Sequence, residues 1–388
     1  MSLSQPNRTV PTLLTAGALL AAPVGTSAEG NVAQGLQLGG HVHTLVSQQS
    51  TDNGGGGSEN ASDVHVSSLE LGLTASPFRY ADATVVWLRE EGVGRTNPDF
   101  HVDQAFVTLA GTSRVLADGT REGTVEDSAA YLQVGKMYIP FATNLAYHTF
   151  DVISEPQTLQ LGETLESGVR VGYHPAELDV YAGVYGGAGQ EGSLNADNEP
   201  ADTDDLDDVF AGINYEGDAG GLAVQYMSNL NNSLALQEEL GRDSNDNVVG
   251  AEDAVGGLTL FGHGEVGPLQ GQLSYVTALA DYDLGNFAGR RPSALNGELT
   301  WTGAGMLPDE RPLRATLVYS HTEEWFDHPE NSMGAVVGTD IAEGVAVAGE
   351  VLHRDYDSSL SSGADTETIA SARLAVGFAE LLGRMRSK

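Results

Sequence analysis

The chain has 388 residues, and its 18 Lys and Arg against 54 Asp and Glu give a formal net charge of −36. This acidic balance argues against a nucleic-acid backbone as partner, because binding to phosphates needs clustered Lys and Arg. The sequence has no cysteine, which excludes a disulfide framework and a thiolate metal site.

The first 28 residues have the composition of a secretory signal peptide. Arg8 supplies a short positive region, and Val10–Val24 forms an apolar stretch rich in Leu and Ala. This stretch is too short for a membrane-spanning helix, which needs roughly 20 apolar residues. The small side chain of Ala28 suits a signal peptidase, so we expect the mature chain to begin at Glu29. Export without cysteine is typical of a Gram-negative envelope protein.

After residue 29 the apolar residues alternate with period two, and no segment has the length of a spanning helix. Sixteen segments are predicted as strands, each of about 9–13 residues, the length that a tilted strand needs to cross a bilayer. In chain order they cover 35–48, 62–74, 79–90, 101–110, 128–138, 164–174, 177–187, 207–216, 220–229, 254–264, 268–281, 293–302, 311–321, 332–339, 342–353 and 366–378.

Several of these strands have one apolar and one polar face. In 311–321 the apolar set is Leu313, Ala315, Leu317 and Tyr319. The residues between them are small or polar, so one face suits hydrocarbon and the other suits water. A soluble sandwich also alternates, and the pattern alone does not distinguish the two.

The connections distinguish them, because they alternate in length as in outer-membrane barrels. Short connections are expected at 75–78, 175–176, 217–219, 265–267 and 340–341, and the first four carry Gly or Pro. Two connections, 111–127 and 303–310, are of medium length. Long ones are expected at 49–61, 91–100, 139–163, 188–206, 230–253, 282–292, 322–331 and 354–365.

The sequence therefore predicts an all-β fold, a transmembrane antiparallel β-barrel of about 16 strands over 29–378, with short periplasmic turns and long external loops. An even strand number closes the barrel without an exposed edge. Sixteen strands enclose a water-filled lumen rather than a packed interior, which predicts a porin in the outer membrane. Residues 379–388 are expected to form a C-terminal extension after Phe378.

Three stretches resemble the LbtU-type siderophore porins of Gram-negative outer membranes. They are Val102–Leu109 (VDQAFVTL), Tyr131–Phe141 (YLQVGKMYIPF) and Leu159–Tyr173 (LQLGETLESGVRVGY). The resemblance implies a porin-like barrel, without a plug domain, that takes up a ferric siderophore. One feature departs from outer-membrane barrels, which normally end on an aromatic residue, because Phe378 is followed by ten further residues.

The connection 139–163 is unusually apolar for an external loop, with Ile139, Phe141, Leu159 and Leu161 among its residues. We expect it to fold inward and narrow the channel; the alternative is an external lid that packs on itself. Folded inward, it brings three carboxylates into the lumen: Asp151, Glu155 and Glu163.

Opposing charges are expected from the inner faces of the strands. Arg170, Arg314 and Arg373 alternate with apolar residues and point inward, with Glu166 beside Arg170. A charged side chain facing lipid near the mid-membrane costs roughly 2–4 kcal/mol. Arginines facing carboxylates create a field that selects polar solutes; the alternative role is ion pairing that holds the loop.

Other patterns carry no chemistry. His41 and His43 share a strand face, but two histidines without a third ligand are more often ordinary lumen groups. The acidic run from Asp243 lacks the glycine and glutamate of a calcium loop. The match to G-x-G-x-x-G at Gly187 precedes a loop rather than a helix. We therefore expect no cofactor, no metal and no catalytic residues.

Three functions remain: uptake of a polar solute, with a ferric siderophore as the cargo that the resemblance implies; general diffusion of ions and small nutrients; and, in another class, a surface adhesin. An outer-membrane lipase would need a paired Ser and His at the rim, which the sequence does not clearly show. Expected partners are the solute and outer-membrane lipids, with the chain as a homotrimer or a monomer.

Overall fold

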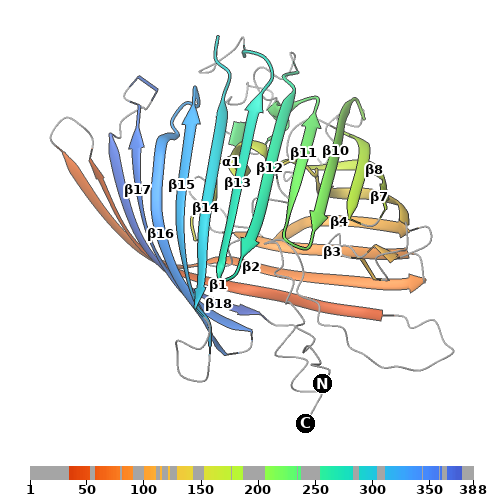
Figure 1. Cartoon of the computed structure of the whole chain (residues 1–388), viewed down its shortest axis with the longest axis horizontal. Coiled ribbons are helices and arrows are strands. Elements are labelled where there is room, and N and C mark those ends of the chain that lie inside the picture. Colours follow the sequence, from red (N-terminus) through yellow and green to blue (C-terminus); the bar gives the residue numbers. More distant parts are fainter. Residues whose placement is uncertain are drawn as a thin grey trace, which may run out of the picture.

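The structure is a computed structural model of the whole chain (Figure 1). It describes residues 35–52, 57–78, 81–90, 100–110, 114–115, 121–122, 129–142, 153–175, 177–186, 206–233, 235–236, 254–282, 288–303, 311–342, 344–357, 359–360 and 365–377. The expected signal peptide, Asp151, Phe378 and the extension 379–388 lie outside these residues.

Sixteen antiparallel strands form a closed barrel in which the first strand pairs with the last. Neighbours around the wall follow chain order, except that β4 pairs with β7 past the small two-stranded sheet β5–β6. The strands are β1 (Gly35–Asp52), β2 (Ser58–Phe78), β3 (Ala81–Glu90), β4 (His101–Ala110), β5 (Arg114–Val115), β6 (Arg121–Glu122), β7 (Ala129–Tyr138), β8 (Leu165–His174), β9 (Leu178–Tyr185), β10 (Asp208–Gly217), β11 (Gly220–Met227), β12 (Gly257–Val266), β13 (Leu269–Ala278), β14 (Ser293–Gly303), β15 (Leu313–Glu323), β16 (Pro329–Ala342), β17 (Val345–Tyr356) and β18 (Thr366–Gly377).

The predicted fold class is confirmed, and each of the sixteen predicted strands corresponds to one strand of the wall. Two of the expected long loops are wrong in length. Residues 49–52 and 58–61 continue the β1–β2 hairpin, and β15 and β16 leave only 324–328 between them. These extensions are largely polar, so hydrophobic alternation does not reveal them, whereas the backbone hydrogen bonds of the hairpins continue.

The wall has an apolar outer face and a polar inner face. On β15, Leu317 is 61% exposed, while its neighbour Thr316 is 1% exposed. The same alternation holds on β14, where the outward Leu299 is 49% exposed and the inward Thr300 is 5% exposed. Thr300 and Thr316 are opposite each other on the two strands, with their hydroxyl oxygens 2.9 Å apart. A closed sheet with this polarity suits a hydrocarbon exterior.

The helices are short. α1 (Gln157–Gly162) follows β7, and the single turn η1 (Leu230–Asn232) follows β11. In the described part of the chain, neither is long and apolar enough to cross a membrane. Both belong to connections between strands, and both connections turn into the interior of the barrel.

Candidate functional site

The connection between β7 and β8, residues 139–164, is called here the internal segment; its residues 139–142 and 153–164 are described. Its helix α1 packs against β13, β14 and β15. The hydroxyl oxygens of Thr158 and Ser274 are 2.7 Å apart. Ser274 alternates on β13 with the exposed Leu273, so this contact lies on the inner face of the wall.

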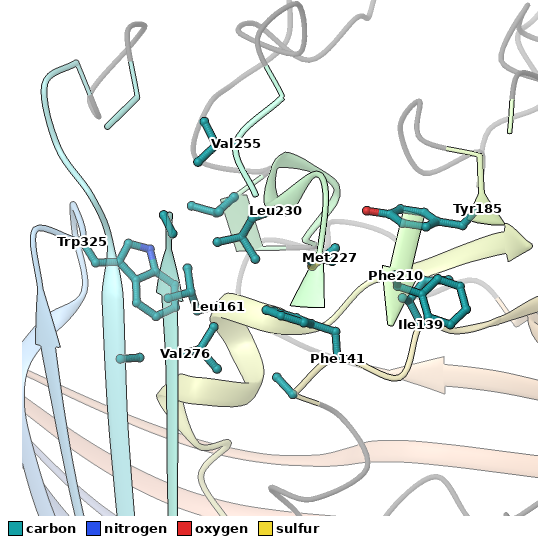
Figure 2. Packing of buried hydrophobic residues seen from close by; sticks show 14 of the residues in the cluster. Ile139, Phe141, Leu161, Tyr185, Phe210, Met227, Leu230, Val255, Val276 and Trp325 are labelled. Carbon is teal, nitrogen blue, oxygen red and sulfur yellow. The ribbon is translucent and has the colours of Figure 1, made fainter. Parts of the chain in front are cut away.

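An apolar cluster fills the space between the internal segment and one side of the wall. Ile139, Phe141 and Leu161 are 0% exposed. Figure 2 shows Phe141 between Val276 on one side and Ile139 and Phe210 on the other. The rest of the cluster comes from β7, β9, β11, β13 and β14 and from connections, including the one between β15 and β16: Tyr131, Ala142, Tyr181, Met227, Leu230, Leu236, Val255, Ala278, Tyr282, Ala294 and Trp325. We call this part of the interior the filled sector.

A second connection contributes to the filled sector. Residues 228–233 turn into the interior after β11, and Leu230 is 0% exposed there. The carboxylate of Asp208 holds this turn by accepting hydrogen bonds from Ser228 Oγ at 2.9 Å, Asn229 Nδ2 at 3.0 Å and Asn232 Nδ2 at 2.9 Å. These three donors satisfy the hydrogen-bonding capacity of a carboxylate that is only 6% exposed.

Polar contacts fix the internal segment to widely separated strands. Glu350 on β17 accepts hydrogen bonds from the backbone N–H of Ile153 at 2.9 Å and of Ser154 at 3.1 Å, and from the Ser154 hydroxyl. At the other end, Gln225 on β11 accepts from the Ala142 N–H at 2.9 Å. The segment is therefore held on both sides of the barrel interior.

The inner faces of β16, β17, β18, β1, β2, β3 and β4 differ, and we call them the charged sector. Arg354 donates to Glu367 at 2.9 Å, and the Tyr356 hydroxyl donates to the same carboxylate at 3.2 Å. Other inward carboxylates of this sector are buried in the wall: Glu70 (5% exposed), Asp82 (2%), Asp103 (4%) and Glu350 (4%). In this sector charged side chains alternate with buried apolar ones such as Val86, Val336 and Leu352.

Of the three arginines predicted to point inward, Arg170 contacts other side chains of the wall. Its guanidinium donates to Asp179 at 3.0 Å and lies over the rings of Tyr131 and Tyr181, at 5.0 and 4.1 Å from their centroids. Tyr181 in turn donates to the carbonyl of Pro140 in the internal segment, at 2.9 Å. Arg170 therefore stiffens the wall beneath the filled sector.

The other two predicted arginines lie elsewhere. Arg314 pairs with Asp340 at 3.4 Å, near the ends of β15 and β16 that face the short turns. Arg373 lies on β18 close enough to His41 and His43 of β1 to act on both imidazoles electrostatically. Arg170, Arg314 and Arg373 thus occupy three separate places in the wall, and the first two pair with carboxylates of neighbouring strands.

The carboxylates predicted for the constriction also differ in position and exposure. Glu155 is exposed beside Ser154, Glu163 is half-buried at the end of α1, and Glu166 is half-buried on β8. Sequence reasoning missed Glu350 and Asp208, which hold the two inward connections. Their positions in the alternating strands place them on the inner face, and this feature could have identified them. The neighbouring sequence does not indicate which residues they bind.

The donor sets do not suggest a bound metal. Among the described residues no group of three or more His, Asp or Glu is arranged as metal ligands.

Comparison with known proteins establishes the fold. No family model matches the sequence, and no curated protein matches it. The outer membrane channel DcaP of Acinetobacter baumannii aligns with a TM-score of 0.55 at 13% identity, over 88% of this chain and 96% of that one. An anion-selective porin from Comamonas acidovorans aligns with a TM-score of 0.53 at 11% identity, over 89% and 99%. Salmonella typhi OmpF in complex with daunomycin gives 0.53 at 13% identity, over 88% and 97%. The chain has the fold of outer-membrane porins.

Proposed function

We propose that the protein is an outer-membrane porin that conducts polar solutes passively. The observation that carries this proposal is the polarity of a closed sixteen-stranded wall, apolar outside and polar inside. A soluble barrel would gain nothing from outward side chains as exposed as Leu317 at 61% and Leu222 at 66%. The shared fold with outer-membrane channels supports the same conclusion.

In this proposal the internal segment is the constriction. It packs on the filled sector and reaches Glu350 in the charged sector, so it crosses the path of a solute. Glu155, Glu163 and Glu166 border the narrowing and place negative charge there; Asp151, also predicted for this role, lies outside the described residues. Arg170, Arg314 and Arg373 place positive charge on the inner face of the wall, and the first two lie beside Asp179 and Asp340.

Two cargoes fit this pore. A ferric siderophore is the cargo implied by the sequence resemblance over 100–175, and it is a polar solute. General diffusion of ions and small nutrients fits the same wall equally well. A surface adhesin would use the barrel only as a support for its external loops and would conduct no solute.

Solute entry into liposomes tests the proposal. We expect liposomes containing the purified protein to swell in sugars and to exclude solutes above a size limit. Deleting about ten residues around Asp151 should raise both the single-channel conductance and the size limit, because the narrowing element leaves while the wall remains. A folded barrel that admits no solute would contradict the porin proposal, and unchanged conductance after the deletion would contradict the constriction.

Iron-limited growth separates the two cargoes. A deletion strain should lose growth on a ferric siderophore and regain it with the intact gene if that chelate is the cargo. Equal growth of both strains on every siderophore, with slower sugar uptake in the deletion strain, would favour general diffusion. Mass spectrometry of the outer-membrane protein should show an N-terminus at or near Glu29, which would establish export and removal of 1–28.

A further inference from the structure

The seam where β1 closes the barrel against β18 carries a compact basic group on its inner face. His41 and His43 stack with their ring centroids 4.3 Å apart and their planes 23° from parallel. In the register of the seam, Arg373 is directly opposite Leu45, so it is diagonal to His43. Diagonal neighbours lie about 7–8 Å apart at Cα, within reach of an arginine side chain. Both imidazoles therefore lie within reach of the Arg373 guanidinium.

The local backbone aims these side chains. The β1–β2 register shifts between His43 and Thr44, so that Ser67 is an extra residue on β2. Ser68 Oγ then lies 3.1 Å from His43 Nδ1, and Ser67 Oγ donates to the His43 carbonyl at 3.4 Å. Bulges of this kind re-aim side chains, often beside functional sites. The orientation of His43 is thus held from the neighbouring strand.

Small side chains lie beside the basic group. Arg373 is opposite Ala348 on β17 and two residues from Ala375 on its own strand, both small side chains. His41, His43 and Arg373 are each half-buried. Glu70, the carboxylate opposite His41, is 5% exposed. The three basic side chains therefore keep part of their surface open on the inner face of the wall.

The seam also lies at the level of the internal segment. Glu350 holds the N–H groups of Ile153 and Ser154, and in the β17–β18 register it is diagonal to Arg373. A solute that passes the internal segment on this side therefore passes the seam.

We propose that His41, His43 and Arg373 form a binding site in the pore for an anionic group, a carboxylate or a phosphate, of the permeating solute. The guanidinium offers paired N–H donors and the imidazoles offer further donors, which match the oxygens of such an anion. A bare metal ion, the other ligand that suits two adjacent histidines, is disfavoured by the positive charge of Arg373. This inference rests on the proposed porin function and names the solute class.

Single-channel recording in a planar bilayer tests the site, with phosphate and citrate as the probes in a chloride bath. We expect both anions to reduce the current through the wild-type protein at low salt, where screening is weak. Arg373→Gln and the double variant H41N/H43N should each raise the half-blocking concentration about tenfold, the loss expected for a charge-assisted hydrogen bond. Block by citrate alone would assign the site to carboxylates, and block by phosphate alone would assign it to phosphates.

Matched controls remove the same kinds of group elsewhere. Arg291→Gln removes an arginine from a connection, where it pairs with Asp281 at 3.4 Å, and His353→Asn removes a histidine on β17 whose side chain is 44% exposed. Phosphate and citrate should block both control variants at the same half-blocking concentration as the wild type. Arg373→Lys keeps the charge without the paired donors and should give an intermediate value, which keeps the test usable if Arg373→Gln does not fold.

Two results would overturn the site. One is an unchanged half-blocking concentration in folded Arg373→Gln. The other is block by Ni²⁺ that depends on His41 and His43, with no effect of phosphate or citrate. If the folded wild-type protein conducts no ions, the porin proposal fails by itself. Phosphorus NMR line broadening with detergent-solubilised protein then decides the site, since broadening lost in Arg373→Gln supports it and the absence of broadening rejects it.

Discussion

The filled sector and the charged sector belong to one wall, yet their interiors follow different rules. In the filled sector, aromatic and aliphatic side chains of β9 to β14 meet Ile139, Phe141 and Leu161 of the internal segment, and water is excluded as in a soluble core. In the charged sector, carboxylates, arginines and histidines project from β16 to β18 and from β1 to β4. The barrel therefore uses part of its wall to hold an internal element and leaves the rest to meet solute.

This comparison assigns different consequences to substitutions in the two sectors. Changes in the filled sector should lower stability first and conduction second. Changes in the charged sector should alter conduction while the barrel stays folded. Four substitutions test the assignment, from the largest expected effect to the smallest.

Phe141→Ala should have the largest effect on stability. The ring is 0% exposed in the apolar cluster, and removing a buried Phe costs about 3–5 kcal/mol. Unfolding of the refolded protein in urea measures the loss, because the folded and the unfolded barrel migrate differently in gel electrophoresis. Val337→Ala, on the outer face of β16 at 50% exposure, is the control and should cost far less. Equal losses would contradict a packed core on one side of the interior.

Arg170→Ala should lower the free energy of unfolding by about 3–5 kcal/mol, because it leaves Asp179 buried without its guanidinium. The two side chains are 13% and 14% exposed. Arg314→Ala removes a pair whose carboxylate is 45% exposed and should cost only about 0–1 kcal/mol. A similar loss in both variants, in the same unfolding assay, would show that the two arginines are equivalent, as the sequence suggested.

Glu350→Ala should release the part of the internal segment that directly precedes α1. It removes the acceptor of the Ile153 and Ser154 N–H groups, and hydrogen bonds to a charged group contribute about 1.5–3 kcal/mol each. Because the apolar cluster remains, we expect a folded barrel with a noisier and larger single-channel current. Glu350→Gln keeps an acceptor oxygen and should give a current nearer that of the wild type. A current identical to wild type in Glu350→Ala would mean that the contact does not position the segment.

Gly212→Ala should have the smallest of these effects, about 1–3 kcal/mol from overpacking. A Cβ on Gly212 would lie 2.3 Å from Tyr181 Oη and 2.4 Å from its Cζ. Gly349→Ala, on the outer face of β17, is the control, since its Cβ would meet nothing closer than 3.9 Å. Thermal unfolding should separate the two variants; equal melting temperatures would indicate that the Tyr181 ring can move aside.

Much of the wall was predictable because its cause is local. Each strand must present alternate residues to lipid and to the interior, so Leu313, Leu317 and Tyr319 identify their strand without knowledge of its neighbours. The polar extensions at 49–52 and 58–61 were missed for the same reason, since they are held by pairing across the hairpin rather than by apolar alternation.

The candidate site was less predictable because its contacts join residues far apart in the chain. The inward parity of Arg170 and Arg314 followed from their strands, but their partners Asp179 and Asp340 follow from strand register. Glu350 lies 196 residues from the Ser154 that it holds, and no local pattern connects them.

The sequence by itself determined the strand number, the polarity of the two faces and the alternation of the connections, because a chain that places strands in hydrocarbon must satisfy its backbone by closing the sheet. Only the tertiary structure decided that the internal segment packs on β13 to β15, that Arg170 serves the wall, and that His41, His43 and Arg373 meet at the seam. The physical reason is that closure brings together the first and last strands, which lie more than 300 residues apart in the sequence, with Val46 opposite Ala372.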